Sequence, residues 1–305
     1  MDGQPAPGCK CCGGPTRRFG AVDAARSCED RRGGPVFAPT GVLVAYWRCR
    51  TCGFVFTRDL DALSEAEMAE RIYNADYARA DPDFADSRPR LFAGLLAGRL
   101  APLRGSLVVL DYGGGQGLLA ALMRAQGFHY DSFDPYFDGT ARPHGSYDLV
   151  TAFEVMEHSR TPLATFHDAL AALRPGGTLL FSTQLVPRGA DAGWWYLGPR
   201  NGHVSLHSDR SLAVCARACG MDSLSLDSGL HLFLPREPDA AARMLANGRL
   251  ESALYAASLR GAWAFLHTAR LALRFGRSGR VAVLSPRHPL RAALAELGLV
   301  RRHCA

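Results

Sequence analysis

The hydrophobic and polar positions along the chain follow three patterns in succession. Residues 1–60 show little helical periodicity and are rich in Cys, Gly, Pro and Arg. Residues 60–103 have a helical pattern, in which Ser64 precedes Glu67 with the spacing of a capping box, so a helix is expected to begin there. From Leu107 onward, short apolar or β-branched runs alternate with helical segments. This alternation predicts a parallel sheet with crossover helices.

Six short segments are expected to be strands of this sheet. The last two are separated by Ser228 and Gly229, a connection too short for a crossover helix, so they are expected to form an antiparallel hairpin. The predicted fold class is α/β, a Rossmann-like doubly wound sheet with a terminal antiparallel hairpin. The expected strands span residues 107–111, 130–134, 147–153, 178–183, 222–227 and 230–234.

The same patterns divide the chain into four expected parts without an internal repeat. The first part cannot build a core from apolar side chains alone. A helical connector, the sheet domain and a helical C-terminal extension follow it. The expected boundaries are 1–60, 61–104, 105–235 and 236–305.

Composition narrows the class of protein. Hydrophobic residues make up 48% and charged residues 21%, which excludes a disordered or fibrous chain. Lys and Arg number 35 against 29 for Asp and Glu, which gives a net charge of +6, and Lys10 is the one lysine. The arginines are spread along the chain, whereas a nucleic-acid binder concentrates its charge on one surface. This favours a bacterial coding bias, and we expect no nucleic-acid partner.

The sequence also bears on location. The first ten residues lack the charged, apolar and small-residue regions of a signal peptide. The longest apolar stretch, residues 254–275, is interrupted by three arginines, whereas a bilayer span needs roughly 20 apolar residues in a row. We therefore expect a cytoplasmic protein.

Arginines of the C-terminal extension form a stripe if this part is helical. At about 100° per residue they fall within an arc of roughly 80°. We favour a solvated face because Trp263 lies in the same arc, and weak contact with a membrane surface is the alternative. The stripe consists of Arg249, Arg260, Arg270 and Arg274.

The strongest chemical signal is LDYGGGQGLL at residues 110–119, where an expected strand runs into glycines and then into a helical run. Glycines allow a tight turn and close approach to a ligand, and the helix N-terminus offers N–H groups. A dinucleotide loop, G-x-G-x-x-G, would need glycine at Leu118 or Gln116. The segment fits D-x-G-x-G-x-G instead. Asp111 would then face a ligand with an ammonium group and a sulfonium, which predicts S-adenosylmethionine.

A second carboxylate is expected beside this loop. An expected strand ends at Asp134, seventeen residues after Gly117. The acidic residue at this place in related folds accepts hydrogen bonds from ribose hydroxyls. A solvated turn before Pro135 is the alternative, and the nearby glycine loop favours the ribose interpretation.

Together these motifs resemble class I S-adenosylmethionine-dependent methyltransferases, specifically bacterial members of the type 11, 12 and 23 groups. The resemblance rests on VLDYGGGQG, FDP, YDLVTAFEVMEHSRTP and LRPGGTLLFST, in the usual order over about residues 107–183. It implies that glycines of the loop contact the methionine part of the donor and that residues 174–177 form a turn before the fifth strand. The implied donor-binding residues are Asp111, Gly113, Gly115, Gly117, Asp134, Phe153 and Glu154.

One departure from the family pattern affects the adenine pocket. Only 13 residues lie between Asp134 and Asp148. This is too few for the usual helix, third strand and acidic loop that contacts adenine. Other residues must form that pocket.

Two C-x-x-C-G turns predict a zinc ribbon. Paired turns of this type present four thiolates tetrahedrally, and a closed site of this kind is structural. Members of the resembled group carry such a ribbon, and YWRCRTCGFVFT is similar to its second turn. Four buried thiols without metal are the alternative, and Cys11 or Cys28 are substitute ligands. The expected ligands of the structural zinc ion are Cys9, Cys12, Cys49 and Cys52.

Two stretches offer acceptor chemistry. In FEVMEHS, Glu154, Glu157 and His158 share one face if the segment is helical. Similar spacing in quinone O-methyltransferases is associated with a divalent metal, but we favour Glu157 and His158 as walls of the pocket. After the fifth strand, aromatic and polar residues form either a stacking surface or a packed lid, and His203 is the candidate general base. This second stretch contains Trp194, Trp195, Tyr196, Asn201, His203 and His207.

Tyr73, Asn74 and Tyr77 either close over the donor or belong to the core. The predicted function is transfer of a methyl group from S-adenosylmethionine to a small-molecule or glycan-type acceptor, such as a sugar hydroxyl or carbon or an aromatic natural product. The candidate catalytic residues are His203, His158 and Glu157. The alternatives are an RNA base methyltransferase with a zinc-ribbon targeting domain and a non-catalytic binding module.

Overall fold

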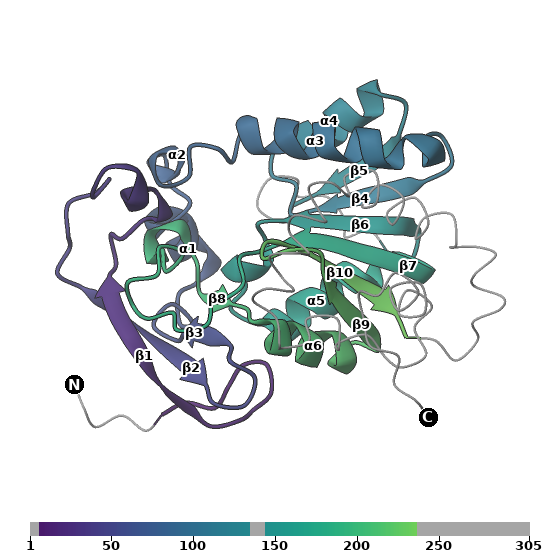
Figure 1. The fold of residues 1–305 in the computed structure, drawn as a ribbon. Helices are drawn as coiled ribbons and strands as arrows, with labels where there is room; N and C mark the ends of the chain where they lie inside the picture. Colours follow the sequence, from purple (N-terminus) through teal and green to yellow (C-terminus); the bar gives the residue numbers. More distant parts are fainter. Residues whose placement is uncertain (1–5, 135–143, 237–305) are drawn as a thin grey trace, which may run out of the picture. The chain divides into compact units, whose positions relative to one another are not determined.

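A computed structural model describes residues 6–134 and 144–236, and the chain folds into two compact units (Figure 1). Each unit is assembled from separate stretches of the chain. The expected C-terminal extension and its arginine stripe lie outside the described residues. Of the described residues, the first unit contains 6–88, 153–167 and 182–215, and the second contains 89–134, 144–152, 168–181 and 216–236.

This division differs from the boundaries expected near residues 60 and 104. Residues 61–88, expected as a connector, belong to the first unit. Met68 and Ile72 are buried there in one core with Tyr46 and Leu206. The sequence pattern missed this because the contacts join residues far apart in the chain.

A four-stranded sheet in the order β1-β2-β3-β8 forms the centre of the first unit. Each neighbouring pair is antiparallel, and the short β8 pairs with β3 through Val55 opposite Leu206. The strands are β1 (Thr16–Asp23), β2 (Leu43–Cys49), β3 (Val55–Thr57) and β8 (Ser205–Leu206).

Short helices complete the first unit. The capping box predicted from the sequence is confirmed, because the Ser64 side chain accepts from the Glu67 N–H and the Glu67 carboxylate accepts from the Ser64 N–H. The helix that follows ends at Arg71. The helices are η1 (Cys28–Arg32), α1 (Glu65–Arg71), α2 (Tyr77–Ala80), η3 (Met156–His158) and η4 (Pro199–Asn201).

The second unit is built on a six-stranded sheet in the order β5-β4-β6-β7-β10-β9. Strand β4 is parallel to β5 and β6, while β9 and β10 form the expected antiparallel hairpin. The predicted Rossmann-like sheet is thereby confirmed. Its strands are β4 (Val108–Tyr112), β5 (His129–Phe133), β6 (Tyr147–Phe153), β7 (Leu173–Ser182), β9 (Met221–Ser225) and β10 (Leu230–Pro235).

The turn expected at residues 174–177 lies within the bounds of β7, which begins at Leu173. Gly176 has a left-handed φ of 85°, and a Cβ on Gly177 would lie 3.1 Å from the Arg174 carbonyl oxygen, so the chain turns there before the strand continues. A Cβ on Gly177 would lie 2.8 Å from Leu173 Cδ2 and 3.0 Å from the Asp148 carbonyl oxygen. The glycine therefore permits a close approach of neighbouring backbone within the sheet.

Of the remaining helices, α3 and η2 precede β4, and α5 and α6 each contain residues of both units. Among the described residues, no helix combines the length and the apolar character that crossing a membrane requires. The helices are α3 (Ser87–Leu100), η2 (Ala101–Leu103), α4 (Leu118–Ala125), α5 (Pro162–Ala171) and α6 (Asp209–Ala218).

Candidate functional site

The glycine loop connects the end of β4 at Tyr112 to the start of α4. Gly113, Gly115 and Gly117 have φ angles of 73°, 57° and 77°. Side chains of L-residues rarely adopt this left-handed conformation, so these three positions require glycine. The left-handed backbone therefore explains why the three glycine positions of the D-x-G-x-G-x-G pattern are occupied by glycine.

Gly114 is required for a different reason. Its φ is not left-handed, but a Cβ there would lie 2.4 Å from Ser132 Oγ and 2.6 Å from Asp111 Oδ2. Ser132 Oγ is buried and has no hydrogen-bond partner within the described part of the chain. A narrow space with an unsatisfied hydroxyl therefore lies against the loop, which fits a polar ligand.

Two carboxylates hold the loop within the second unit. Asp134, which directly follows β5, is 8% exposed, and its Oδ2 accepts a hydrogen bond from the Gly115 N–H at 2.9 Å. Asp111 is 3% exposed, and its Oδ1 lies 3.0 Å from the Thr151 hydroxyl. Burial, together with a smaller effect of the negative charge of Asp134, raises the pKa of Asp111 to about 7. Asp111, expected as the carboxylate at the end of the strand, is thus buried against Gly114 of the loop.

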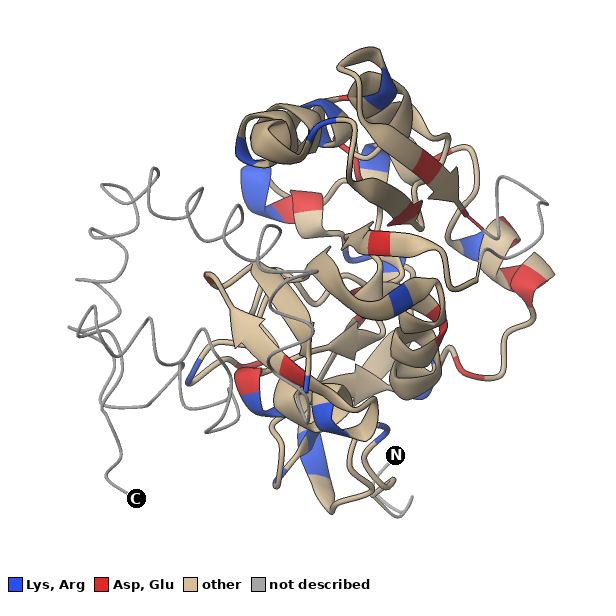
Figure 2. Ribbon diagram, turned by 90° about the vertical axis from the view of Figure 1, so that its right-hand side faces the viewer, with Lys and Arg blue, Asp and Glu red and all other residues tan. Residues whose placement is uncertain are grey.

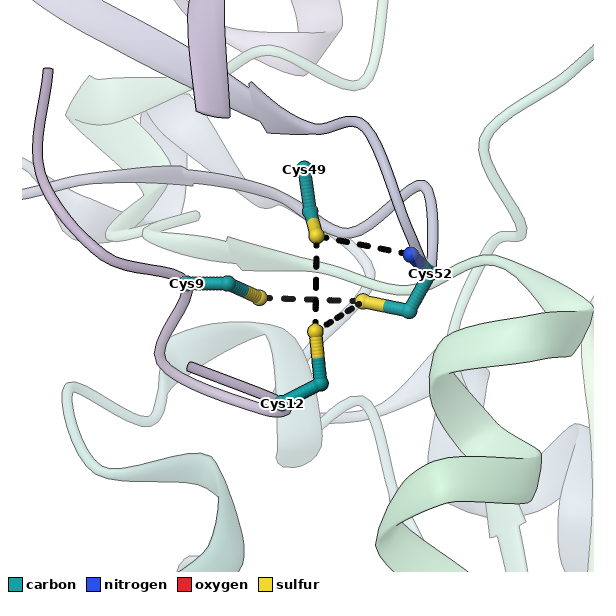
Figure 3. Close-up of side chains that lie close together, drawn as sticks. All are labelled: Cys9, Cys12, Cys49 and Cys52. Atoms are coloured by element: carbon teal, nitrogen blue, oxygen red, sulfur yellow. Dashed lines mark hydrogen bonds between the residues drawn. The ribbon is translucent and has the colours of Figure 1, made fainter. Parts of the chain in front are cut away.

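The four predicted zinc ligands converge in the first unit (Figure 3). The sulfur atoms of Cys9 and Cys52 are 3.6 Å apart, and Cys12 Sγ lies 3.4 Å from Cys49 Sγ and 3.6 Å from Cys52 Sγ. A tetrahedral zinc ion with metal–sulfur distances of roughly 2.3 Å requires sulfur–sulfur edges of about 3.8 Å. The observed separations are close to this value and far longer than a disulfide bond.

The backbone of the two turns also suits thiolate ligands. Cys49 Sγ accepts from the N–H groups of Thr51 at 3.3 Å and Cys52 at 3.4 Å. Gly13 and Gly53, which end the two turns, have left-handed φ angles of 69° and 76°. The donor set therefore fits a closed zinc site.

The two substitute ligands proposed from the sequence lie elsewhere. Cys28 Sγ is 3.5 Å from His203 Nδ1. Cys11 lies with His207 and Cys215, and the three ligand atoms are within 4.8 Å of one another. The structure therefore assembles the original four cysteines, and Cys11 belongs to a second group that the sequence did not predict.

Glu154, Glu157 and His158 do not share a helix face, which corrects the expectation from their spacing. Glu154 has a left-handed φ of 54°, alone among the non-glycine residues that the structure describes, and η3 begins after it. The Glu154 N–H donates to Ser182 Oγ at 2.8 Å, and that hydroxyl donates to Glu154 Oε1 at 2.8 Å. Such strained conformations cluster at functional sites.

Tyr196 joins the two carboxylates instead. Its hydroxyl oxygen lies 2.9 Å from Glu154 Oε2 and 2.5 Å from Glu157 Oε1. Burial raises the pKa of Glu157 well above its usual value, and the charge of Glu154 adds to the shift. The hydroxyl has one hydrogen, so a protonated Glu157 donates to Tyr196, and Tyr196 donates to Glu154.

Two histidines adjoin Glu157. The ligand atoms of Glu157, His158 and His203 lie within 4.8 Å of one another. His203 Nδ1 is 3.0 Å from the Tyr196 carbonyl oxygen, which can only accept, so Nδ1 carries the hydrogen and Nε2 the lone pair. Burial lowers the pKa of His203 to about 4 and that of His158 to about 3. Both imidazoles are neutral at pH 7.

Some polar atoms of Glu157, His158 and His203 have unsatisfied hydrogen-bonding capacity. Glu157 Oε2 and His158 Nδ1 are buried without a hydrogen-bond partner in the described ranges. The three side chains can hold a divalent cation or a water molecule, or receive a hydroxyl group. The low pKa of His203 makes it a weak proton acceptor unless a ligand changes its surroundings.

The aromatic stretch packs into the first unit. Tyr196 is buried, Trp194 and Trp195 pack against the same core, and the Arg31 guanidinium lies 3.7 Å from the ring centre of Trp195. Asn201 is also buried, and its Oδ1 accepts from the Cys28 N–H at 2.8 Å. These contacts favour the packed alternative over an open stacking surface.

Tyr73 and Tyr77 pack against the same core. They are not on one helix, because α1 ends at Arg71 and α2 begins at Tyr77, but their ring centres are 5.2 Å apart. Asn74 Oδ1 accepts from the Arg200 guanidinium at 2.8 Å. Of the two expectations for Tyr73 and Tyr77, these contacts therefore favour a place in the core over closure upon the donor.

Sequence reasoning missed Ser132, Ser182 and the linking role of Tyr196. Their roles depend on contacts between segments that are distant in the chain, which leave no local pattern. The additional cysteine in C-x-C-C was a signal for the second thiol group, because the zinc ribbon needs only two cysteines from that turn.

Comparisons with known proteins address the family directly. A family model described as a methyltransferase domain matches residues 79–226. A ubiquinone biosynthesis O-methyltransferase from Vibrio parahaemolyticus is 31% identical over 100 residues, which cover 25% of this chain and 43% of that protein. An uncharacterized methyltransferase from Mycobacterium sp. (strain KMS) is 28% identical over 153 residues, which cover 44% and 57% of the two chains.

The alignment with the Vibrio protein thus spans less than half of that protein's length. Among solved structures, 1,6-didemethyltoxoflavin-N1-methyltransferase from Burkholderia thailandensis is 16% identical with a TM-score of 0.42, and the match covers 67% of this chain and 98% of that one. The family match contains the glycine loop, both of its carboxylates and the strands around them. Residues 79–226 of this chain are therefore similar to a methyltransferase domain.

Proposed function

We propose that this chain transfers the methyl group of S-adenosylmethionine to a small-molecule or glycan-type acceptor, with a hydroxyl oxygen as the leading candidate atom. The glycine loop carries this proposal, because it combines three left-handed glycines with the Asp134 carboxylate in one unit. The Vibrio relative is an O-methyltransferase, which supports an oxygen acceptor.

Donor binding is assigned to residues of the second unit. The loop at residues 113–117 would lie against the methionine part, and Asp134 would accept from the ribose hydroxyls while it retains the Gly115 N–H. The unsatisfied Ser132 hydroxyl beside Gly114 supports a polar ligand there. The donor supplies an electrophilic methyl group, so transfer is an in-line displacement in which positioning provides most of the rate.

The acceptor side is assigned to Glu157, His158 and His203. A hydroxyl acceptor must lose a proton, and a neutral imidazole with a lone pair on Nε2 can receive it. The unsatisfied atoms Glu157 Oε2 and His158 Nδ1 support a polar occupant. A divalent cation at these residues would lower the pKa of a bound hydroxyl group, and this is the second way in which the same group could assist.

Zinc belongs to the same proposal as a structural ion. Cys9, Cys12, Cys49 and Cys52 form a closed set, which leaves no coordination position for chemistry. We therefore assign the ion a role in holding the first unit together.

Charge distribution supports a small acceptor over RNA. Lys and Arg segments alternate with Asp and Glu segments over the ribbon in Figure 2. Ion pairs join Arg32 to Asp83, Arg71 to Glu67, Arg79 to Asp76, Arg88 to Asp81 and Arg174 to Asp148. An RNA methyltransferase should instead bind RNA with a steep salt dependence, which a gel shift at several salt concentrations measures.

Calorimetric titration of the full chain with S-adenosylmethionine tests the proposal. Gly114→Ala should weaken binding by roughly tenfold or more, because the new Cβ displaces the loop, Asp111 or Ser132. Gly94→Ala is the matched control, since a Cβ at Gly94 meets nothing within 4 Å, and its affinity should equal that of the unaltered chain. Absence of binding by the unaltered chain would leave a non-catalytic module as the better description.

A further inference from the structure

Three metal-binding side chains outside the four-cysteine site meet in the first unit. Cys11 comes from the first cysteine turn, His207 follows β8, and Cys215 lies in α6. Their ligand atoms lie within 4.8 Å of one another, and all three residues are buried. Neither the methyltransferase fold nor the zinc ribbon requires this group.

We infer that Cys11, Cys215 and His207 bind a second zinc ion, with the sulfur of Cys9 as a ligand shared between the two ions. Two thiolates and one imidazole form a soft donor set that zinc favours. This site does not depend on methyl transfer and can be tested without it.

Cys9 is the cysteine of the first site that adjoins the second group, through Cys11, and we assign it as the fourth ligand. Its side chain contacts both Cys11 and Cys52, and its sulfur accepts from the Cys11 N–H at 3.4 Å. Two tetrahedral ions need eight ligand positions. Six cysteines and one histidine fill these positions when one sulfur is shared.

The hydrogen bonds around His207 orient its ring for coordination. Ser211 Oγ donates to the Ser208 carbonyl at 3.0 Å and accepts from the Ser208 N–H at 2.8 Å. Because its hydrogen is used, its 3.3 Å contact with His207 Nδ1 requires that Nδ1 donates. Nε2 then carries the lone pair, and we assign it as the ligand atom. A second hydrogen-bonding group of this kind typically fixes the tautomer of a metal-bound histidine.

The segment that contains His207 is attached to the second cysteine turn. Strand β8 pairs with β3, which follows that turn, and Ser208 Oγ donates to the Cys52 carbonyl at 2.5 Å. A Cβ on Gly53 would lie 3.2 Å from Ser208 Oγ, so the two backbones approach closely. The second ligand group is therefore held beside the first by contacts that do not involve metal.

Zinc content of the full-length chain, purified under reducing conditions, tests this inference. Native mass spectrometry and elemental analysis should both give two zinc ions per chain. Cys215→Ser should retain one, because it leaves Cys9, Cys12, Cys49 and Cys52 intact. Cys219→Ser is the matched control, since Cys219 lies just beyond α6 and in neither ligand set, and it should retain two.

Cobalt substitution adds a readout of ligand identity. Thiolate-to-cobalt absorption should decrease in Cys215→Ser and persist in Cys219→Ser. One zinc ion in the unaltered chain, or two in Cys215→Ser, would overturn the inference. So would a Cys11–Cys215 disulfide found by peptide mapping without reductant. If Cys215→Ser fails to fold, thiolate-to-cobalt absorption from both ions of the unaltered chain decides the question, because the other candidate group, Glu157, His158 and His203, contains no thiolate.

Discussion

The glycine loop of the second unit and the cysteine turns of the first are built from similar backbone but completed differently. Both have left-handed glycines, and both direct N–H groups toward an acceptor. In the loop the acceptor is the Asp134 carboxylate, so the chain supplies both partners. In the turns the acceptors are sulfur atoms, whose charge is balanced only when a cation binds. The loop therefore retains its shape without ligand, while the turns depend on metal.

The largest expected difference between the two regions is their loss of stability when zinc is removed. Structural zinc contributes on the order of 10 kcal/mol to small metal domains. A chelator should therefore abolish hydrogen-exchange protection of β2 and β3, while β4 and β6 keep theirs. Undiminished protection of β2 and β3 in fully demetallated protein would show that the core holds the first unit without metal.

Acid should affect the two units in opposite directions. The pKa values of His203 and His158, about 4 and 3, lie below the ordinary value of 6.5, so the unfolded chain binds protons more readily. Stability of the first unit should fall as pH decreases from about 6.5, by about 1.4 kcal/mol per unit for each histidine, and the raised pKa of Glu157, which acts with the opposite sign, should offset part of this loss. Exchange protection measured between pH 7 and pH 5 would reveal this loss.

The second unit should respond with the reverse sign. Burial raises the pKa of Asp111 from 3.8 to about 7, so its neutral form favours the folded state and stability declines as pH rises between these values. Asp111→Asn should remove this dependence and leave the acid response of the first unit unchanged. Parallel pH trends in the two units would contradict the comparison.

Asp134→Ala tests whether the loop is complete by itself. The substitution removes the acceptor of the Gly115 N–H and the expected ribose contact, and we expect a loss of about 2 kcal/mol, or about thirtyfold in donor affinity. Zinc content should not change. Asp131→Ala, at an exposed position in β5, is the control in calorimetric titration. Normal donor affinity of Asp134→Ala would remove the ribose assignment.

The smallest expected effect concerns Tyr196. Tyr196→Phe removes the hydroxyl shared by the half-buried Glu154 and the buried Glu157 and should lower the free energy of unfolding by about 1 kcal/mol. Tyr77→Phe is the control, because its hydroxyl makes only a 3.5 Å contact with the Asn201 carbonyl. Equal destabilisation in urea denaturation would indicate that Tyr196 acts through ring packing alone.

The sequence correctly predicted the elements that are determined by neighbouring residues in the chain. The expected strand at residues 147–153 coincides with β6, and the capping box marks the start of α1. The four cysteines were found from spacing, because each pair lies within one turn. Glu154 was misplaced because its spacing resembles a helix, while its left-handed φ depends on Ser182, distant in the chain.

The pairing of β8 with β3 also constrains how the protein can be made. A chain emerging from the ribosome presents β3 early, and its partner at Ser205–Leu206 appears only after β4 to β7 have been synthesised. Strand β3 therefore remains without its partner, and accessible to chaperones, until β8 has been synthesised. Excising the first 60 residues for independent expression would therefore yield a sheet with an unprotected edge, whatever metal is supplied.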